Sequence, residues 1–314
     1  MAVVSNFVRR MNRLLPVLRS GTRVMSDSSS LPGVPSSTFI SGAMSYQSNI
    51  SKDGDRRGQT SNIVDVDGRK IHCEETGSGK HHVLLMPGAL GSSITDFMPQ
   101  LRNFNKDMFS LIAWDPPGYG KSYPPSREWV DNFLHEDAKI AARLMEVLDI
   151  TKYSLLGWSD GGITAMILAA AHPEHVKKLV IWGANSYLTK DERDMLRKIQ
   201  NIDQWSEKMK KPYLDVYGEE YFRKAWAQWV DAFIKSYFDS ADGDICKGIL
   251  SKITCPSLII HGGKDVIVPQ LHPDFLHKQI LGSRLVNMPD GKHNLHLQFY
   301  KEFNSIVENF LLEQ

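Results

Sequence analysis

The sequence has little cysteine, no long apolar run and almost no net charge, and each shortage excludes a class of protein. The three cysteines, Cys73, Cys246 and Cys255, are too few and too widely spaced for a disulfide framework. The sequence contains no Cys-x-x-Cys pair, so it gives no sign of a structural zinc site. No apolar run approaches the ~18 residues that a membrane-crossing helix needs. Lys and Arg number 37 against 36 Asp and Glu, and this net charge of +1 gives no reason to expect a nucleic-acid partner.

Acidic residues are absent from residues 1–26, which carry five arginines. Without this segment the net charge would fall from +1 to −4. At 100° per residue its apolar side chains share one helical face and the arginines lie off it. Such a start is typical of a mitochondrial presequence, with a basic cytosolic tail as the alternative. Residues 27–60 are rich in Ser and Gly and show neither helical nor strand periodicity, which predicts a flexible linker.

From residue 61 onward, short apolar strands alternate with helices. This alternation predicts an α/β fold with a mostly parallel, doubly wound sheet, built from residues 61–185 and 251–314. An Asp67-Gly68 turn joins the first two strands into an antiparallel hairpin at one edge. The expected strands cover residues 62–66, 70–74, 82–86, 109–114, 153–156, 178–182, 257–261 and 284–288, and the expected helices cover 131–148, 161–171 and 293–312.

Residues 186–250 interrupt this alternation. They contain no strand pattern, only charged, helix-compatible sequence that is rich in Trp and Tyr. A helical insertion between two strands predicts a cap over the carboxyl edge of the sheet, where ligands bind in such folds. Most of its aromatic side chains are expected simply to pack the cap onto the body.

The strongest chemical signal is the segment Gly157-Trp158-Ser159-Asp160-Gly161, which matches G-x-S-x-G. It directly follows a predicted strand and directly precedes a predicted helix. In that context the serine sits in a tight turn that lifts its hydroxyl above the sheet, and the flanking glycines avoid a clash with neighbouring backbone. The segment therefore predicts Ser159 as a nucleophile.

A serine hydroxyl needs a base, and the base needs an orienting acid. In this architecture the order along the chain is serine, acid, histidine. Asp265 follows a strand after the cap, and His293 follows the last strand, so both loops reach the edge where Ser159 lies. His296, inside the final predicted helix, is the rival base. Asp290 is an alternative acid, although it lies very close to His293 in sequence.

An ester hydrolase also needs donors for the oxyanion of its tetrahedral intermediate. One is expected from the Asp160 backbone N–H, the residue after the nucleophile. The other is expected from the loop at residues 87–91, where the sequence does not decide between the Ala89 and Leu90 amides. A further shaped loop begins at Asp115, and we interpret its aspartate and glycines as holding a turn.

The Asp160 side chain has two readings. An acidic residue that opens a helix complements the helix dipole, which contributes ~0.3–1 kcal/mol. The same carboxylate is also a fixed negative charge beside the nucleophile, under a cap that excludes water. It therefore favours a substrate with a cationic acyl part, such as an ester with a free α-ammonium, through a contact worth about 1.5–3 kcal/mol.

Four segments carry a family resemblance: LLGWSDGGITA at 155–165, AWDPPGYG at 113–120, KLVIWGAN at 178–185 and GKHNLH at 291–296. With them, residues 61–314 resemble the serine hydrolases of the α/β-hydrolase fold, and within these the biphenyl hydrolase-like group. The resemblance implies hydrolysis of α-amino acid esters, a mitochondrial location and no cofactor. It also implies that Asp160 binds the substrate amine. No metal site is expected either. The oxyanion loop departs from the fold's usual His-Gly pair, having Pro87-Gly88 instead.

The sequence thus predicts a cofactor-independent serine esterase that acts on a small-molecule ester. Ser159, Asp265 and His293 form its catalytic triad. Dehalogenases and epoxide hydrolases of the same fold would need an aspartate at position 159. A carbon–carbon bond hydrolase also uses serine and stays an alternative. A non-catalytic ligand-binding protein is the other alternative, and a degraded triad would favour it.

Overall fold

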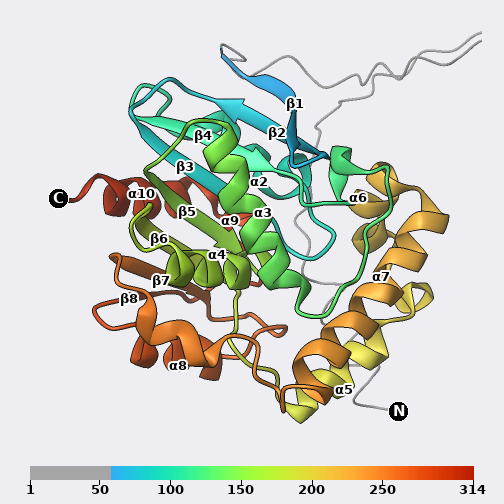
Figure 1. The fold of residues 1–314 in the computed structure, drawn as a ribbon. Coiled ribbons are helices and arrows are strands. Elements are labelled where there is room, and N and C mark those ends of the chain that lie inside the picture. The colour runs from blue at the N-terminus through green and yellow to red at the C-terminus, as the bar shows by residue number, and fades with distance from the viewer. Residues whose placement is uncertain (1–57) are drawn as a thin grey trace, which may run out of the picture.

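The computed structural model describes residues 58–314 as an eight-stranded sheet in the order β1-β2-β4-β3-β5-β6-β7-β8 (Figure 1). The strand β2 is antiparallel to both of its neighbours, and all the other pairings are parallel. The α/β fold class expected from the sequence is confirmed. The predicted presequence and residues 27–57 of the predicted linker lie outside the described residues. The strands are β1 (Thr60–Val66), β2 (Arg69–Thr76), β3 (His81–Met86), β4 (Phe109–Trp114), β5 (Tyr153–Trp158), β6 (Val176–Trp182), β7 (Ser257–Gly262) and β8 (Arg284–Met288).

Helices connect and cover these strands, and the closing helix is broken into two pieces, at Phe299, where one helix was expected. The helices are α2 (Ser93–Asn103), α3 (Phe133–Val147), α4 (Asp160–Ala171), α5 (Lys190–Ile199), α6 (Glu207–Tyr217), α7 (Glu219–Phe233), α8 (Leu271–Gln279), α9 (Leu295–Gln298) and α10 (Tyr300–Leu312). Short 3-10 turns lie at Gly120–Ser122, Ile202–Gln204 and Lys247–Lys252, and a π-helical turn lies at Ile234–Asp239. Among the described residues, no helix combines the length and hydrophobicity needed to cross a membrane.

Two apolar clusters sandwich the sheet because successive strand residues face opposite sides. In β3, Leu84 and Met86 pack into the cluster that also holds α3 and α4. Val83 and Leu85 pack into the other cluster, with α2 and α10. Figure 1 shows α3 and α4 in front of the sheet and α10 behind it. Both faces are therefore covered, which explains why the parallel strands are almost uniformly apolar.

The helices α5, α6 and α7 gather beyond one edge of the sheet, on the right in Figure 1. In residues 186–250 the only β-type pairing is a single antiparallel bridge between Tyr187 and Asp244. Aromatic rings hold these helices together. Trp205 lies 4.7 Å from Trp226, and Trp226 lies 4.7 Å from Trp229, measured between ring centroids. We call residues 190–233, which comprise α5, α6, α7 and the segments between them, the cap.

Candidate active site

Ser159 stands in a tight turn between β5 and α4. Its φ of 55° and ψ of −122° lie outside the regions that non-glycine residues normally adopt. The Ser159 amide donates to the Trp182 carbonyl at 3.0 Å, which fixes the turn against β6. A Cβ on Gly157 would come within 2.4 Å of the Gly161 carbonyl oxygen, and one on Gly161 within 2.0 Å of the Met86 carbonyl oxygen. Both glycines are therefore required by close backbone approach.

The His293 ring and the Asp265 carboxylate form a direct pair. Nδ1 of His293 lies 2.9 Å from Oδ2 of Asp265, whose side chain is 1% exposed. The other carboxylate oxygen accepts the amides of Ile267 and Val268 at 2.8 and 3.0 Å. Burial alone would raise the pKa of Asp265, but His293 and these two amides hold that pKa below its ordinary value. An ionised carboxylate only accepts, so the His293 Nδ1–H donates to it and Nε2 is left for the substrate side.

Ser159 and His293 line one cavity of about 150 Å³. The His293 backbone is held by the Trp158 indole, whose Nε1 donates to the His293 carbonyl at 2.9 Å. A Cβ on Gly183 would lie 2.9 Å from Cε1 of the His293 ring, so this glycine leaves room for the imidazole. The structure thus brings the serine, the histidine and the aspartate to the same end of the sheet.

The two alternatives considered from sequence, His296 as the base and Asp290 as the acid, lie outside the cavity. His296 is fully buried, with Nδ1 accepting from Trp182 Nε1 and Nε2 bonded to the Asp96 carbonyl, both at 2.9 Å. Burial lowers the pKa of His296 to about 3, so this imidazole stays neutral. Asp290 is exposed and pairs with Lys264. Neither residue lines the cavity.

The predicted oxyanion loop is a tight turn. The Gly91 amide donates to the Gly88 carbonyl at 2.9 Å, and between them Leu90 has a φ of 51°. Oδ2 of Asp96, a residue of α2, accepts a hydrogen bond from the Gly88 amide at 3.0 Å. We call residues 88–91 the oxyanion turn.

Two residues of the oxyanion turn line the cavity, and the amide of one of them, Gly88, is already bonded to Asp96. Ala89 lines the cavity, and no other described group accepts its N–H. Leu90 does not line it, and its carbonyl accepts a hydrogen bond from the Tyr217 hydroxyl at 2.9 Å. The Asp160 amide is at the N-terminus of α4, where helical N–H groups lack intrahelical partners. Ala89 and Asp160 are therefore the two predicted donors that the geometry favours.

The Asp160 side chain is buried under the cap. Its Oδ2 accepts from Nε1 of Trp229 at 2.7 Å, and Trp229 itself belongs to the cavity wall. Burial raises the pKa of Asp160 to about 7, against the opposing effects of Trp229 and Arg127. Asp160 also lines a second, smaller cavity of about 10 Å³, together with Asp137. The Asp160 carboxyl thus lies beside the nucleophile, and a nearby cation would stabilise its ionised form.

The wall of the larger cavity carries no carboxylate, lysine or arginine. The cap supplies half of it, through Leu196, Ile199, Trp205, Met209, Tyr213, Trp226 and Trp229. The sequence predicts packing roles for most cap aromatics and does not distinguish those that line the cavity. The crowding of Trp and Tyr was the available signal, but it does not separate the two roles.

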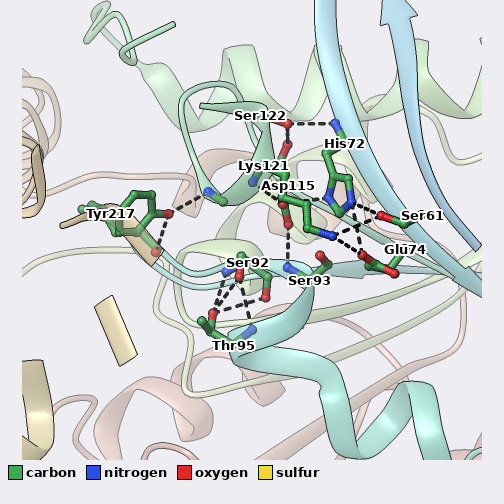
Figure 2. A network of polar contacts seen from close by, with 12 residues as sticks. Ser61, His72, Glu74, Ser92, Ser93, Thr95, Asp115, Lys121, Ser122 and Tyr217 are labelled. Atoms are coloured by element: carbon green, nitrogen blue, oxygen red, sulfur yellow. Dashed lines mark hydrogen bonds and ion pairs between the residues drawn. The ribbon is translucent and has the colours of Figure 1, made fainter. Parts of the chain in front are cut away.

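Asp115 holds loops together, as its sequence context predicts. Its carboxylate accepts from the amides of Ser93 and Lys121, at 2.6 and 2.8 Å, and from His72 Nδ1 at 2.8 Å. Figure 2 shows how this network joins β2, the start of α2 and the loop after β4. Glu74 completes it by accepting from the Lys121 ammonium at 2.8 Å.

One group among residues 58–314 has the spacing of metal ligands: His172, Glu174 and His175, whose ligand atoms lie within 4.8 Å of one another. The group follows the C-terminus of α4, whereas Ser159 precedes its N-terminus. Twelve helical residues span about 18 Å. The group therefore takes no part in chemistry at Ser159.

The sheet order, the strand–serine–helix turn and the buried Asp–His pair are those of an α/β hydrolase, and the chain belongs to the alpha/beta hydrolase fold family, whose model matches residues 81–200 and 184–300. Within that fold it is a serine hydrolase. It is 50% identical over 252 residues to serine hydrolase BPHL of Homo sapiens, a match that covers 80% of this chain and 86% of that protein.

Two solved structures extend the comparison. The esterase EaEST from Exiguobacterium antarcticum is 26% identical, with a TM-score of 0.63 over 80% of this chain and 98% of that one. The meta-cleavage product hydrolase from Pseudomonas fluorescens IP01 has a TM-score of 0.65 at 17% identity, over 79% and 96% of the chains, and shows the fold alone. The resemblance seen in the motifs is confirmed for the fold and for the serine hydrolase class.

Proposed function

We propose that this protein is a serine esterase that cleaves α-amino acid esters. The observation that carries the proposal is the hydrogen-bonded Asp265–His293 pair at a cavity that Ser159 also lines. In this mechanism His293 Nε2 takes the Ser159 proton as Oγ attacks the ester carbonyl carbon. The amides of Asp160 and Ala89 bind the oxyanion. His293 then protonates the departing alcohol, and water hydrolyses the acyl-enzyme with His293 again as base.

The preference for a free amine rests on the Asp160 carboxylate. It lies next to the nucleophile in sequence, is buried, and has a single hydrogen-bond donor among the described residues, Trp229. A substrate α-ammonium is two bonds from the carbonyl that Ser159 attacks. The small cavity beside Asp160 has room for about one water-sized group, which is the size of an ammonium. Ionising Asp160 next to that cation removes part of the cost of burying its charge.

A hydrolysis panel with one alcohol and three acyl parts tests the proposal: a free α-amino ester, its N-acetyl form and its desamino form. Only the first is expected to be a good substrate, and Ser159→Ala is expected to abolish its turnover. A fluorophosphonate probe should label Ser159. An unlabelled Ser159, or equal rates on all three esters, would contradict the proposal. A 2-hydroxy-6-oxodienoate in the same panel tests the carbon–carbon alternative.

We also propose that residues 1–26 direct the protein to mitochondria. The support is their five arginines, their lack of acidic residues and the spacing of their apolar residues, which predicts one apolar helical face. A fluorescent reporter fused to residues 1–60 should enter mitochondria, and the same fusion with the five arginines changed to glutamine should not. A reporter that stays diffuse in the cytosol would refute this location.

A further inference from the structure

One hydroxyl of the cap reaches the oxyanion turn. Tyr217 is the last residue of α6 and is buried. Its hydroxyl donates to the Leu90 carbonyl at 2.9 Å and accepts the Gly120 amide at 2.8 Å. Figure 2 shows Tyr217 beside the Asp115 network, with both bonds drawn at its hydroxyl. A side chain of the cap therefore satisfies two backbone groups of the sheet domain, and one of them belongs to the oxyanion turn.

The oxyanion turn needs such support. Leu90 has a φ of 51°, in the left-handed region that non-glycine residues keep only when their surroundings impose it. Asp96, from α2, holds the start of the turn through the Gly88 amide. Tyr217 holds its other half through the Leu90 carbonyl. Ala89, which lines the cavity, lies between these two attachments.

We propose that Tyr217 is a positioning residue. Through its hydroxyl, the geometry of the oxyanion hole depends on the cap being packed against the sheet domain. Tyr217 touches no reacting atom, and it acts by fixing the turn that presents the Ala89 amide. The inference rests on the proposed esterase mechanism, because it needs that amide to bind the oxyanion. A displaced amide weakens binding of the transition state more than binding of the ester, so the effect falls on kcat rather than on KM.

The chain supplies a matched control four residues further on. The Tyr221 hydroxyl donates to the Gly118 carbonyl at 2.9 Å and accepts the Arg127 amide at 3.4 Å. Tyr221 therefore ties the cap to the sheet domain in the same chemical way, but it holds the loop after β4 and not the oxyanion turn. Loss of either hydroxyl weakens the attachment of the cap to the sheet domain. Only loss of the Tyr217 hydroxyl removes a hydrogen bond from the oxyanion turn.

The experiment compares wild type, Tyr217→Phe and Tyr221→Phe on one ester. Fluorophosphonate titration counts the competent molecules, so each rate is per active site even if a variant partly misfolds. A trifluoromethyl ketone, which adds to the serine and carries an oxyanion, reports the hole directly. Removal of one oxyanion donor costs about 10²–10³ in kcat, and a displaced donor should cost about tenfold. We expect Tyr217→Phe to lose about tenfold in kcat with KM within about twofold, and ketone affinity to fall in proportion.

Tyr221→Phe should lower the thermal unfolding temperature and leave kcat and ketone affinity near wild type. An unchanged kcat and ketone affinity in Tyr217→Phe would overturn the inference. So would equal kcat losses in both variants, because these would reveal a general effect of cap anchoring. A wild-type enzyme that neither hydrolyses esters nor takes the probe would instead refute the proposed function itself, which separates the two failures.

Discussion

Replacing Asp160 by asparagine removes one negative charge beside the nucleophile and keeps an oxygen that can accept the Trp229 hydrogen bond. If the carboxylate binds the substrate ammonium, the variant loses a charge-assisted contact worth about 1.5–3 kcal/mol. At about 1.4 kcal/mol per tenfold, kcat/KM for a free α-amino ester should fall by about 10- to 150-fold. Esters without the ammonium never make the contact, so their already poor kcat/KM should change little.

The same substitution should increase the free energy of unfolding at neutral and higher pH. Burial raises the pKa of Asp160 from 3.8 to about 7, so the folded protein binds this proton more tightly than the unfolded chain. Below pH 3.8 the group is protonated in both states and folding carries no penalty. Stability is lost as the pH rises from there to about 7, and the loss above that pH is at most about 4 kcal/mol. Asparagine does not ionise, so Asp160→Asn should match wild type near pH 4 and be more stable above pH 7.

The assay measures kcat/KM between about pH 5 and 9 for L-leucine benzyl ester, its N-acetyl form and benzyl 4-methylpentanoate. Thermal unfolding is followed in the same buffers. The ratio of the wild-type kcat/KM values for the free amino ester and for benzyl 4-methylpentanoate should rise as Asp160 ionises near pH 7, and this rise should be absent from the variant. If Asp160→Asn reduces all three rates equally, the side chain only shapes the turn. A variant less stable than wild type above pH 7 would refute the argument from burial.

Two further substitution pairs test the site. His293→Ala should lose about 10⁴-fold or more in kcat, whereas His296→Ala should mainly destabilise the protein, by about 1–3 kcal/mol for each partner left unpaired. Near-normal kcat in His293→Ala would show that the wrong histidine was assigned. Gly161→Ala places a Cβ 2.0 Å from a backbone oxygen and should cost about 3 kcal/mol or more in the free energy of unfolding, while Gly248→Ala, with nothing within 4 Å, should cost little. Equal unfolding midpoints for these two variants would contradict the crowding argument.

All eight strands were predictable from sequence to within two residues at each end. A strand buried on both faces gives a short apolar run with clear ends, and that signal does not depend on which strands become its neighbours. The helices α2 and α8 were missed. The first contains Pro99, and its N-terminal cap pairs Ser92 with Thr95 rather than with the more familiar glutamate. The second is mostly polar and carries Pro273 in its first turn, where proline is tolerated.

The chemical groups of the site were predictable for a different reason. The proposed triad is defined by the order of its members and by their places after strands, and both can be read along the chain. The contacts that tune the site are not local. Trp229 and Asp160 are 69 residues apart, and Tyr217 and Leu90 are 127 apart. No spacing rule connects such pairs, so only the folded cap shows that it both lines the cavity and holds the oxyanion turn.

His293 and His296 show how position decides the character of chemically identical side chains. A charged His293 is balanced by the Asp265 carboxylate at 2.9 Å, so it can take up and release a proton. A charged His296 would have no carboxylate to balance it, because both ring nitrogens are bonded to neutral partners, the Trp182 indole and the Asp96 carbonyl. His296 is bonded to the Asp96 carbonyl, and the Asp96 carboxylate holds the oxyanion turn through the Gly88 amide. The buried histidine therefore stabilises the frame in which the other one acts, which is why its loss is expected to reduce stability before it reduces the chemical step.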